Sequence, residues 1–91
     1  MGAVDFTTTA RGSSAEAAFS AAVSEARHEH GHGGYTGTVA EKPGFYMVRQ
    51  QEDETPYACI ERLIDDNDKW GPAACLHIDG TLYLFFGLAS E

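Results

Sequence analysis

The spacing of apolar and polar residues along the chain predicts a helix near the N-terminus. Apolar residues recur there at intervals of three and four, which places them on one helix face. They are Ala15, Ala18, Phe19, Ala22, Val23 and Ala26. Ser13 and Glu16 form a capping box at its start, in which the Ser13 hydroxyl would accept from the backbone N–H of Glu16. Gly31 would end this helix.

Strands are predicted on either side of the helix. Residues 4–10 are rich in β-branched and aromatic types, and Gly12 follows them as a breaker. Residues 35–41 and 45–49 are also strand-like. The turn chemistry of Lys42-Pro43-Gly44 between these two segments predicts a hairpin.

A second helix and a second hairpin follow. Thr55 would cap the helix, and Pro56 would occupy its first position. Its buried face is predicted to hold Tyr57, Ile60, Leu63 and Ile64. Residues 74–78 and 81–86 would then pair through a type I′ turn at Asp79-Gly80. The last strand is apolar on both faces, which indicates a central position in the sheet.

The α-β-β unit therefore occurs twice, and the order is β-α-β-β-α-β-β over a single domain of residues 1–91. Because each helix and the sheet must bury an apolar face, we expect an α+β fold. The economical assembly is a mostly antiparallel five-stranded sheet with two helices on one face.

The charge balance narrows the classes of partner. The chain holds fourteen acidic and six basic residues, a formal net charge of −8. Phosphate binding needs clustered Lys and Arg, so we expect neither direct nucleic-acid binding nor membrane binding, and a basic protein surface is the natural partner. Without a bilayer-spanning stretch or a recognisable signal peptide, a cytoplasmic location is expected. Cys59 and Cys75 are then expected to be reduced and buried.

Much of the negative charge lies in one region that ends beside a tryptophan. Its residues are Glu52, Asp53, Glu54, Glu61, Asp65, Asp66, Asp68 and Trp70. Position six counted from Asp65 is Trp70 and not glycine, which argues against a calcium loop. The region is either a solvated helix face or a docking surface for a basic protein. Trp70 is predicted to be a lid over the core.

A histidine- and glycine-rich segment is the other unusual feature, and three interpretations of it stay open. It could be a metal site built on His28 and His32, an anion site, or a structural connector after the helix. The ligand segment would comprise His30, His32, Gly33, Gly34, Tyr35, Thr36 and Lys42. No specific catalytic set can be assembled, so a binding protein is favoured over an enzyme, and no cofactor is expected.

Two motifs together resemble a known group of proteins. The first motif is residues 34–42, GYTGTVAEK, and the second is KWGPA at residues 69–73 with FFGLAS at residues 85–90. The chain resembles small, functionally uncharacterised proteins borne by bacteriophages and prophages, which carry GYTGT-(I/V)-AEK and KWGPA leading to FFG-x-AS. This resemblance supplies no reaction. It implies an accessory protein expressed in a bacterial cytoplasm.

Three functional hypotheses follow from the residues and this context. The first is an acidic inhibitor, anti-CRISPR-like or of another counter-defence kind. It would bind a basic surface on a host bacterial protein. The second is a small-molecule binder that sequesters or processes a nucleotide-like defence signal, for which a homo-oligomer would help to enclose the ligand. The third is a metal-binding protein that uses the histidine cluster.

Overall fold

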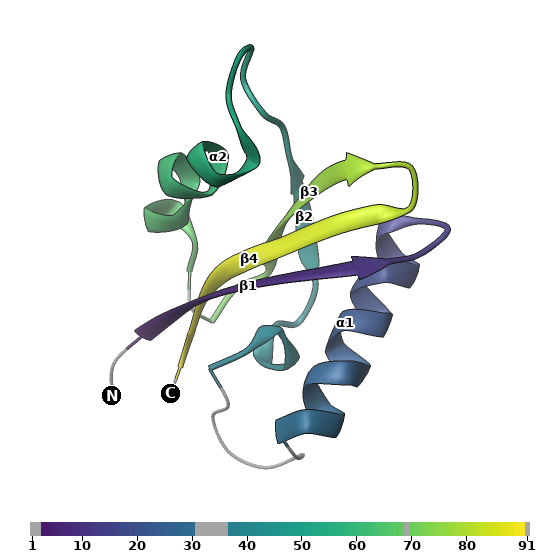
Figure 1. Cartoon of the computed structure of the whole chain (residues 1–91). Coiled ribbons are helices and arrows are strands. Elements are labelled where there is room, and N and C mark those ends of the chain that lie inside the picture. Colours follow the sequence, from purple (N-terminus) through teal and green to yellow (C-terminus); the bar gives the residue numbers. More distant parts are fainter. Residues whose placement is uncertain (1–2, 31–36, 69, 91) are drawn as a thin grey trace.

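The computed structural model of the chain describes residues 3–30, 37–68 and 70–90. The elements follow the order β1 (Ala3–Arg11), α1 (Ala15–His30), η1 (Val39–Glu41), β2 (Phe45–Val48), α2 (Pro56–Leu63), η2 (Ile64–Asp66), β3 (Ala73–Asp79) and β4 (Leu82–Ser90). The two η elements are 3-10 helices. The described strands form one four-stranded sheet in the order β1-β4-β3-β2 (Figure 1). The α+β class and the central position of the last strand are confirmed.

The prediction of five mostly antiparallel strands is wrong in two respects. Of residues 35–41, the first two lie outside the described residues, and Val39–Glu41 is a 3-10 helix capped by the Thr38 side chain. Gly37 has a φ of 70°, which a regular strand does not accommodate. Among the described residues, β2 therefore has no hairpin partner before it. It pairs with β3 in parallel, because the chain crosses through α2 before it returns to the sheet.

The two helices lie on opposite faces of the sheet. The prediction that both lie on one face is therefore wrong. Ala18 and Ala22 of α1 pack with Cys75 of β3. Cys59 of α2 packs with Leu76, the next residue along the same strand. Since successive side chains of a strand point to opposite faces, α1 and α2 must cover different sides. Each face of the sheet has its own core.

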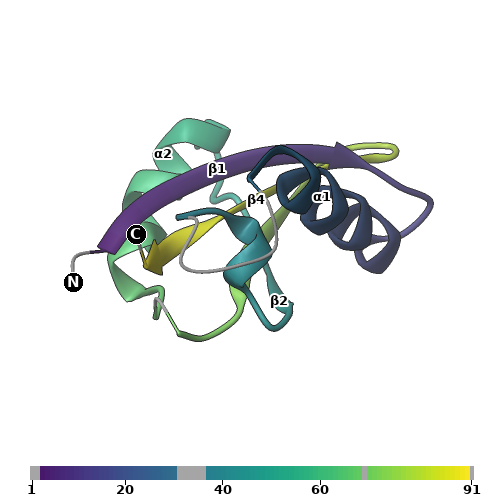
Figure 2. The same cartoon turned by 90° about the horizontal axis from the view of Figure 1, so that it is seen from below.

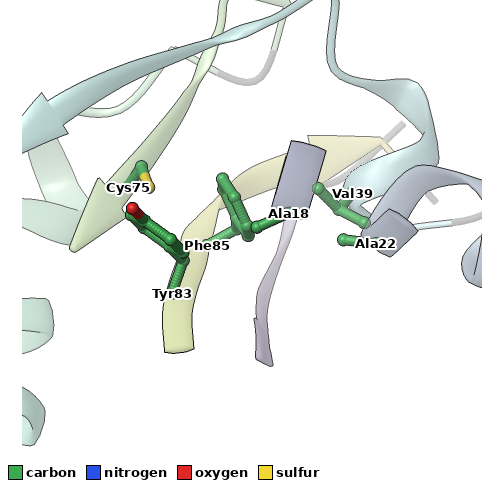
Figure 3. Close-up of a cluster of buried hydrophobic side chains, with 6 residues drawn as sticks. All are labelled: Ala18, Ala22, Val39, Cys75, Tyr83 and Phe85. Atoms are coloured by element: carbon green, nitrogen blue, oxygen red, sulfur yellow. The ribbon is translucent and has the colours of Figure 1, made fainter. Parts of the chain in front are cut away.

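The α1 face is built on aromatic side chains. Phe19 of α1, Phe45 of β2 and Phe85 of β4 form a triangle, with ring centroids 5.2 to 5.8 Å apart. The alanine stripe allows α1 to lie close to the sheet, as expected, and Ala18 is fully buried. Figure 3 shows the buried residues of this cluster, contributed by α1, η1, β3 and β4. They are Ala18, Ala22, Val39, Cys75, Tyr83 and Phe85.

The helix starts are set by side-chain caps. α1 begins one residue later than the capping box predicts, because Ser14 and not Ser13 accepts from a backbone N–H, that of Ala17 at 3.1 Å. The cap of α2 is confirmed, with Thr55 Oγ1 accepting from Ala58 N–H at 3.1 Å. The prediction that Tyr57 lies on the buried face of α2 is wrong, because its side chain is 70 % exposed.

Two further predictions concern the last hairpin and the thiols. The turn between β3 and β4 is shifted by one residue, to Gly80 and Thr81, and a register irregularity between His77 and Asp79 absorbs the shift. Gly80 has a φ of 43°, in the left-handed region, which glycine adopts without the steric cost of a side chain. The two cysteines are free and buried, as expected, and burial raises the pKa of Cys75 to about 11.

Candidate functional site

A buried polar network joins the two sequence motifs. Lys42 of the first motif is 5 % exposed, and its ammonium donates to Asn67 Oδ1 at 3.1 Å and to the Asp68 carbonyl at 2.9 Å. Asn67 Oδ1 also accepts from Leu88 N–H at 2.8 Å, and Nδ2 donates to the Pro72 carbonyl at 3.0 Å. The side chain of one asparagine thus holds both parts of the second motif against the first.

Other contacts make this network tight. Glu41 accepts from the backbone N–H of Ser90 at 3.0 Å and from that of Gly37. A Cβ atom on Gly87 would lie 2.5 Å from Asn67 Oδ1, so only glycine fits beside the asparagine. Burial lowers the pKa of Lys42, and the charge of Asp68 opposes that shift. The Lys42 ammonium is bonded within the fold. In this structure the motif residues Glu41 and Lys42 therefore hold the chain after α2 and the end of β4 against η1.

A groove of about 590 Å³ opens between α2 and β1 on the opposite face of the sheet, and we call it the acidic groove. It is lined by Asp5, Thr7, Tyr57, Ile60, Glu61, Ile64 and Asp65. On one side of the groove, Tyr57, Ile60 and Glu61 share a face of α2, because they are spaced by three and four residues, and Ile64 and Asp65 follow in η2. The β1 side comes from residues two apart, which share one face of a strand.

The carboxylates of the acidic groove have no cationic partner among the residues that the structure describes. Asp5, Glu61 and Asp65 form no ion pair or hydrogen bond through their side chains with any described residue. Tyr57, 70 % exposed, and the half-buried Ile60 add an apolar surface between these charges. Acidic groups around an accessible apolar floor fit a ligand that is both cationic and partly apolar.

Other predicted acidic residues have different environments. Glu54 is paired within the protein, because Arg62 Nε donates to its carboxylate at 2.7 Å and Arg62 NH2 at 2.8 Å. These bonds, together with one from Gln51 N–H, hold the pKa of Glu54 at about 2. Glu54 therefore stabilises the loop before α2, and its charge is balanced. Glu52 and Asp53 are exposed in that loop.

The remaining predicted residues lie beyond α2. Asp66 and Asp68 are exposed, and Asp68 Oδ1 accepts from Trp70 N–H at 3.0 Å. The prediction of Trp70 as a core lid is wrong, since Trp70 is 57 % exposed. Asp5 and Tyr57 were not among the predicted site residues. The available signal was the spacing of Tyr57, Glu61 and Asp65 at intervals of four, which predicts an aromatic ring and two carboxylates on one side of a helix; in the structure Asp65 lies in η2, which follows α2.

The predicted ligand segment falls mostly outside the described residues. This holds for His32, Gly33, Gly34, Tyr35 and Thr36, and for the side chain of His30. A hollow of about 620 Å³ lies next to this segment, between α1 and the chain after η1. It is lined by Phe19, Ser20, Val23, Ser24, Arg27, His28, Lys42 and Pro43. We call it the basic hollow, because Arg27 and His28 lie on its α1 side and no described carboxylate lines it.

The described residues also bear on metals and membranes. They contain no group of three or more His, Cys, Asp or Glu side chains placed to hold a metal ion. His32, the proposed partner of His28, is outside them. No helix among them is long and apolar enough to cross a membrane.

Comparison of the chain with protein families, with curated proteins and with solved structures finds no match.

Proposed function

We propose that this protein acts by binding, and that its acidic groove holds the basic surface of a host bacterial protein, most simply a defence protein that it inhibits. The observation that carries this proposal is the convergence of Asp5, Glu61 and Asp65, all without a cationic partner among the described residues, around an exposed aromatic ring. The resemblance of the two motifs to phage-borne proteins supports the counter-defence context.

The chemistry of the groove fits a lysine- or arginine-bearing polypeptide. Such side chains combine an aliphatic stem with a cationic head. The stem can contact Ile60 and Ile64 while the head meets Glu61 or Asp65, and the exposed face of Tyr57 can receive a cation. The overall charge of −8 would steer a basic partner towards the protein and repel nucleic acid. A partner that uses this basic surface to bind nucleic acid would then be blocked.

The first test places a photo-crosslinking amino acid at position 57 in cells. We expect an adduct with a host protein when the crosslinker replaces Tyr57, and none when it replaces Met47, which is 50 % exposed on β2. The double variant Glu61→Lys/Asp65→Lys should lose the adduct. The affinity of the purified partner should fall at least about tenfold and should also fall with added salt.

The matched control is the double variant Glu16→Lys/Asp79→Lys. It makes the same change in net charge at two exposed residues outside the groove. It should keep the adduct and most of the affinity. Equal losses in both double variants would show that only total charge matters, and an adduct that survives reversal at Glu61 and Asp65 would remove the groove from the function.

A second candidate function is supported by the basic hollow. Arg27 makes no ion pair or hydrogen bond with the described residues, although the protein is strongly acidic. Ser20, Ser24 and Arg27 recur at intervals of four and three, so they lie on one face of α1. With His28 beside them, these groups can donate hydrogen bonds to an anionic small molecule such as a nucleotide.

Thermal unfolding against a panel of cyclic and linear nucleotides tests the second candidate. A nucleotide at 100 times its dissociation constant should stabilise the protein by about 2.7 kcal/mol. Arg27→Ala should abolish this shift, whereas Arg49→Ala, an exposed arginine outside the hollow, should retain it. If no nucleotide shifts the unfolding temperature, or if Arg27→Ala leaves the shift intact, the hollow has no such role.

A further inference from the structure

The outer edge of β1 is a long and regular sheet edge that no described strand covers. β1 has nine residues, pairs with β4 without interruption from Ala3 to Arg11, and contains neither proline nor lysine. No described strand pairs with its other side, and Figure 2 shows it running along the outside of the sheet. Natural edge strands are usually short, charged with lysine, bulged or interrupted by proline, because a free edge binds another strand. β2, the opposite edge, is short, with four residues.

The backbone groups that face outward from β1 can be identified from one hydrogen bond. Gly12 N–H donates to the carbonyl of Thr81, and the register between β1 and β4 places these two residues opposite each other. Residues of an antiparallel pair alternate between bonded and non-bonded positions. Even-numbered residues of β1 therefore bond to β4, and odd-numbered residues turn their N–H and C=O groups to the free edge.

We propose that this edge binds the same edge of a second copy of the chain, antiparallel and centred on Thr8. The sequence of β1 is self-complementary in this register. Thr8 lies opposite Thr8 of the second copy, Thr7 opposite Thr9, and Asp5 opposite Arg11. Odd residues pair with odd residues, as the outward backbone groups require. Two Asp5–Arg11 pairs form by symmetry, and both side chains are exposed on the same face of the strand.

Neighbouring registers are less favourable. A register centred on Thr7 or on Thr9 also pairs odd residues but leaves both charges opposite uncharged residues. In the register centred on Thr8, Phe6 also lies opposite Ala10, so a large side chain meets a small one. A hollow of about 110 Å³ lies beside Thr8 on the α1 side of the strand, and it is lined by Thr8, Thr9, Ala22, Glu25, Ala26, Glu29 and Thr38. The result of the pairing is one eight-stranded sheet, twice the four strands of one copy.

The pairing and the proposed function share Asp5, which lines the acidic groove and would meet Arg11 of the second copy in the dimer, but their tests change different residues. The pairing depends on Asp5 and Arg11, whereas the test of the acidic groove reverses Glu61 and Asp65. Because Asp5 also lines the groove, the pairing would place the two grooves of a dimer on the same face of the joined sheet. Loss of the dimer would leave the groove in each copy, and loss of groove binding would leave the dimer.

Mass measurement of the full chain by light scattering and sedimentation tests the proposal. We expect a dimer whose dissociation constant rises at least about tenfold in Asp5→Arg and in Arg11→Asp, since each change puts like charges opposite each other twice. The double variant Asp5→Arg/Arg11→Asp restores opposite charges and should restore the dimer. Circular dichroism confirms that each variant remains folded.

Disulfide trapping tests the register without changing charge. Residues at a non-bonded antiparallel pair lie about 4.5 Å apart between Cα atoms, a distance that a disulfide spans. Thr8→Cys should therefore give a covalent dimer under mild oxidation, and the buried native cysteines should not compete. Thr7→Cys, whose own copy lies diagonally at about 7–8 Å, should give much less. A monomer at all concentrations, failure of the double charge swap, or equal trapping at both positions would each overturn the proposal.

Discussion

Asn67→Ala should lower the free energy of unfolding by about 3 kcal/mol, because it removes the centre of the buried polar network. The asparagine is 4 % exposed, and its side chain has four hydrogen-bond partners, among them the Lys42 ammonium and Tyr46 OH. Alanine would leave Leu88 N–H without its side-chain acceptor and would leave a buried cation with one acceptor fewer. Urea unfolding followed by circular dichroism measures the loss.

A double-mutant cycle with Lys42→Met separates the cation from the rest of the network. Methionine keeps much of the aliphatic volume and removes the charge. In the Lys42→Met background, Asn67→Ala should cost clearly less, because no buried ammonium is left unpaired. If the two losses simply add, then Lys42 and Asn67 are not coupled, and the proposed reason for the first loss is wrong. Asp66→Ala, an exposed neighbour, should change stability by about 0.5 kcal/mol or less.

The loss in Asn67→Ala should also depend on pH. Burial lowers the pKa of Lys42 below its ordinary value of 10.5 in the folded protein, so the unfolded chain binds the proton more tightly. Stability therefore rises as pH increases towards 10.5. Removing an acceptor lowers the folded-state pKa further, and the difference between Asn67→Ala and the parent protein should narrow as the pH rises towards 10.5. Lys42→Met should abolish this narrowing.

Local structure was largely predictable because its causes lie within a few residues. The alanine stripe of α1, the threonine cap with Pro56 on α2, and the β-branched run of β1 each predict the element that the structure contains. The failure at residues 37–41 has a local explanation. Thr38 and Val39 have high strand propensity, but Gly37 has a positive φ and the Thr38 hydroxyl caps a 3-10 turn.

The arrangement of these elements could not be predicted, because it depends on contacts far apart in the sequence. The two helices lie on opposite faces because β3 is apolar on both faces, and Ala74 and Cys75 are both fully buried. Because both faces of β3 are apolar, the pattern does not determine which helix covers which face. The parallel pairing of β2 with β3 likewise depends on where α2 returns the chain.

The acidic groove was predictable in part. Charge alone identified Glu61 and Asp65, and it also selected Glu54, whose charge Arg62 neutralises. The contribution of Asp5 required that the face of β1 that carries Asp5 and Thr7 is the face towards α2, which no local pattern determines. Conversely, the motif residues Glu41 and Lys42 drew attention as a ligand segment, but their side chains bind Ser90, Asn67 and Asp68 inside the fold.

Gly12→Ala should destabilise the protein by at least about 3 kcal/mol, because the start of α1 lies directly against this glycine. A Cβ atom at position 12 would lie 2.4 Å from Ala18 N and 2.9 Å from Ala17 C, both backbone atoms of a helix. Neither atom can move without shifting α1, and Gly12 N–H is itself bonded to the Thr81 carbonyl. The methyl group would therefore separate α1 from the end of β1, which should appear as a lower midpoint of thermal unfolding.

Gly44→Ala is the matched control for this prediction. A Cβ atom at position 44 would meet no other atom within 4 Å, and Gly44 is not among the residues with positive φ. Alanine there should leave stability unchanged or raise it by up to about 1 kcal/mol, because it restricts the unfolded chain. Near-parental stability in Gly12→Ala would mean that α1 and β1 can separate at little cost. The close packing of the alanine stripe would then not be what fixes the helix on the sheet.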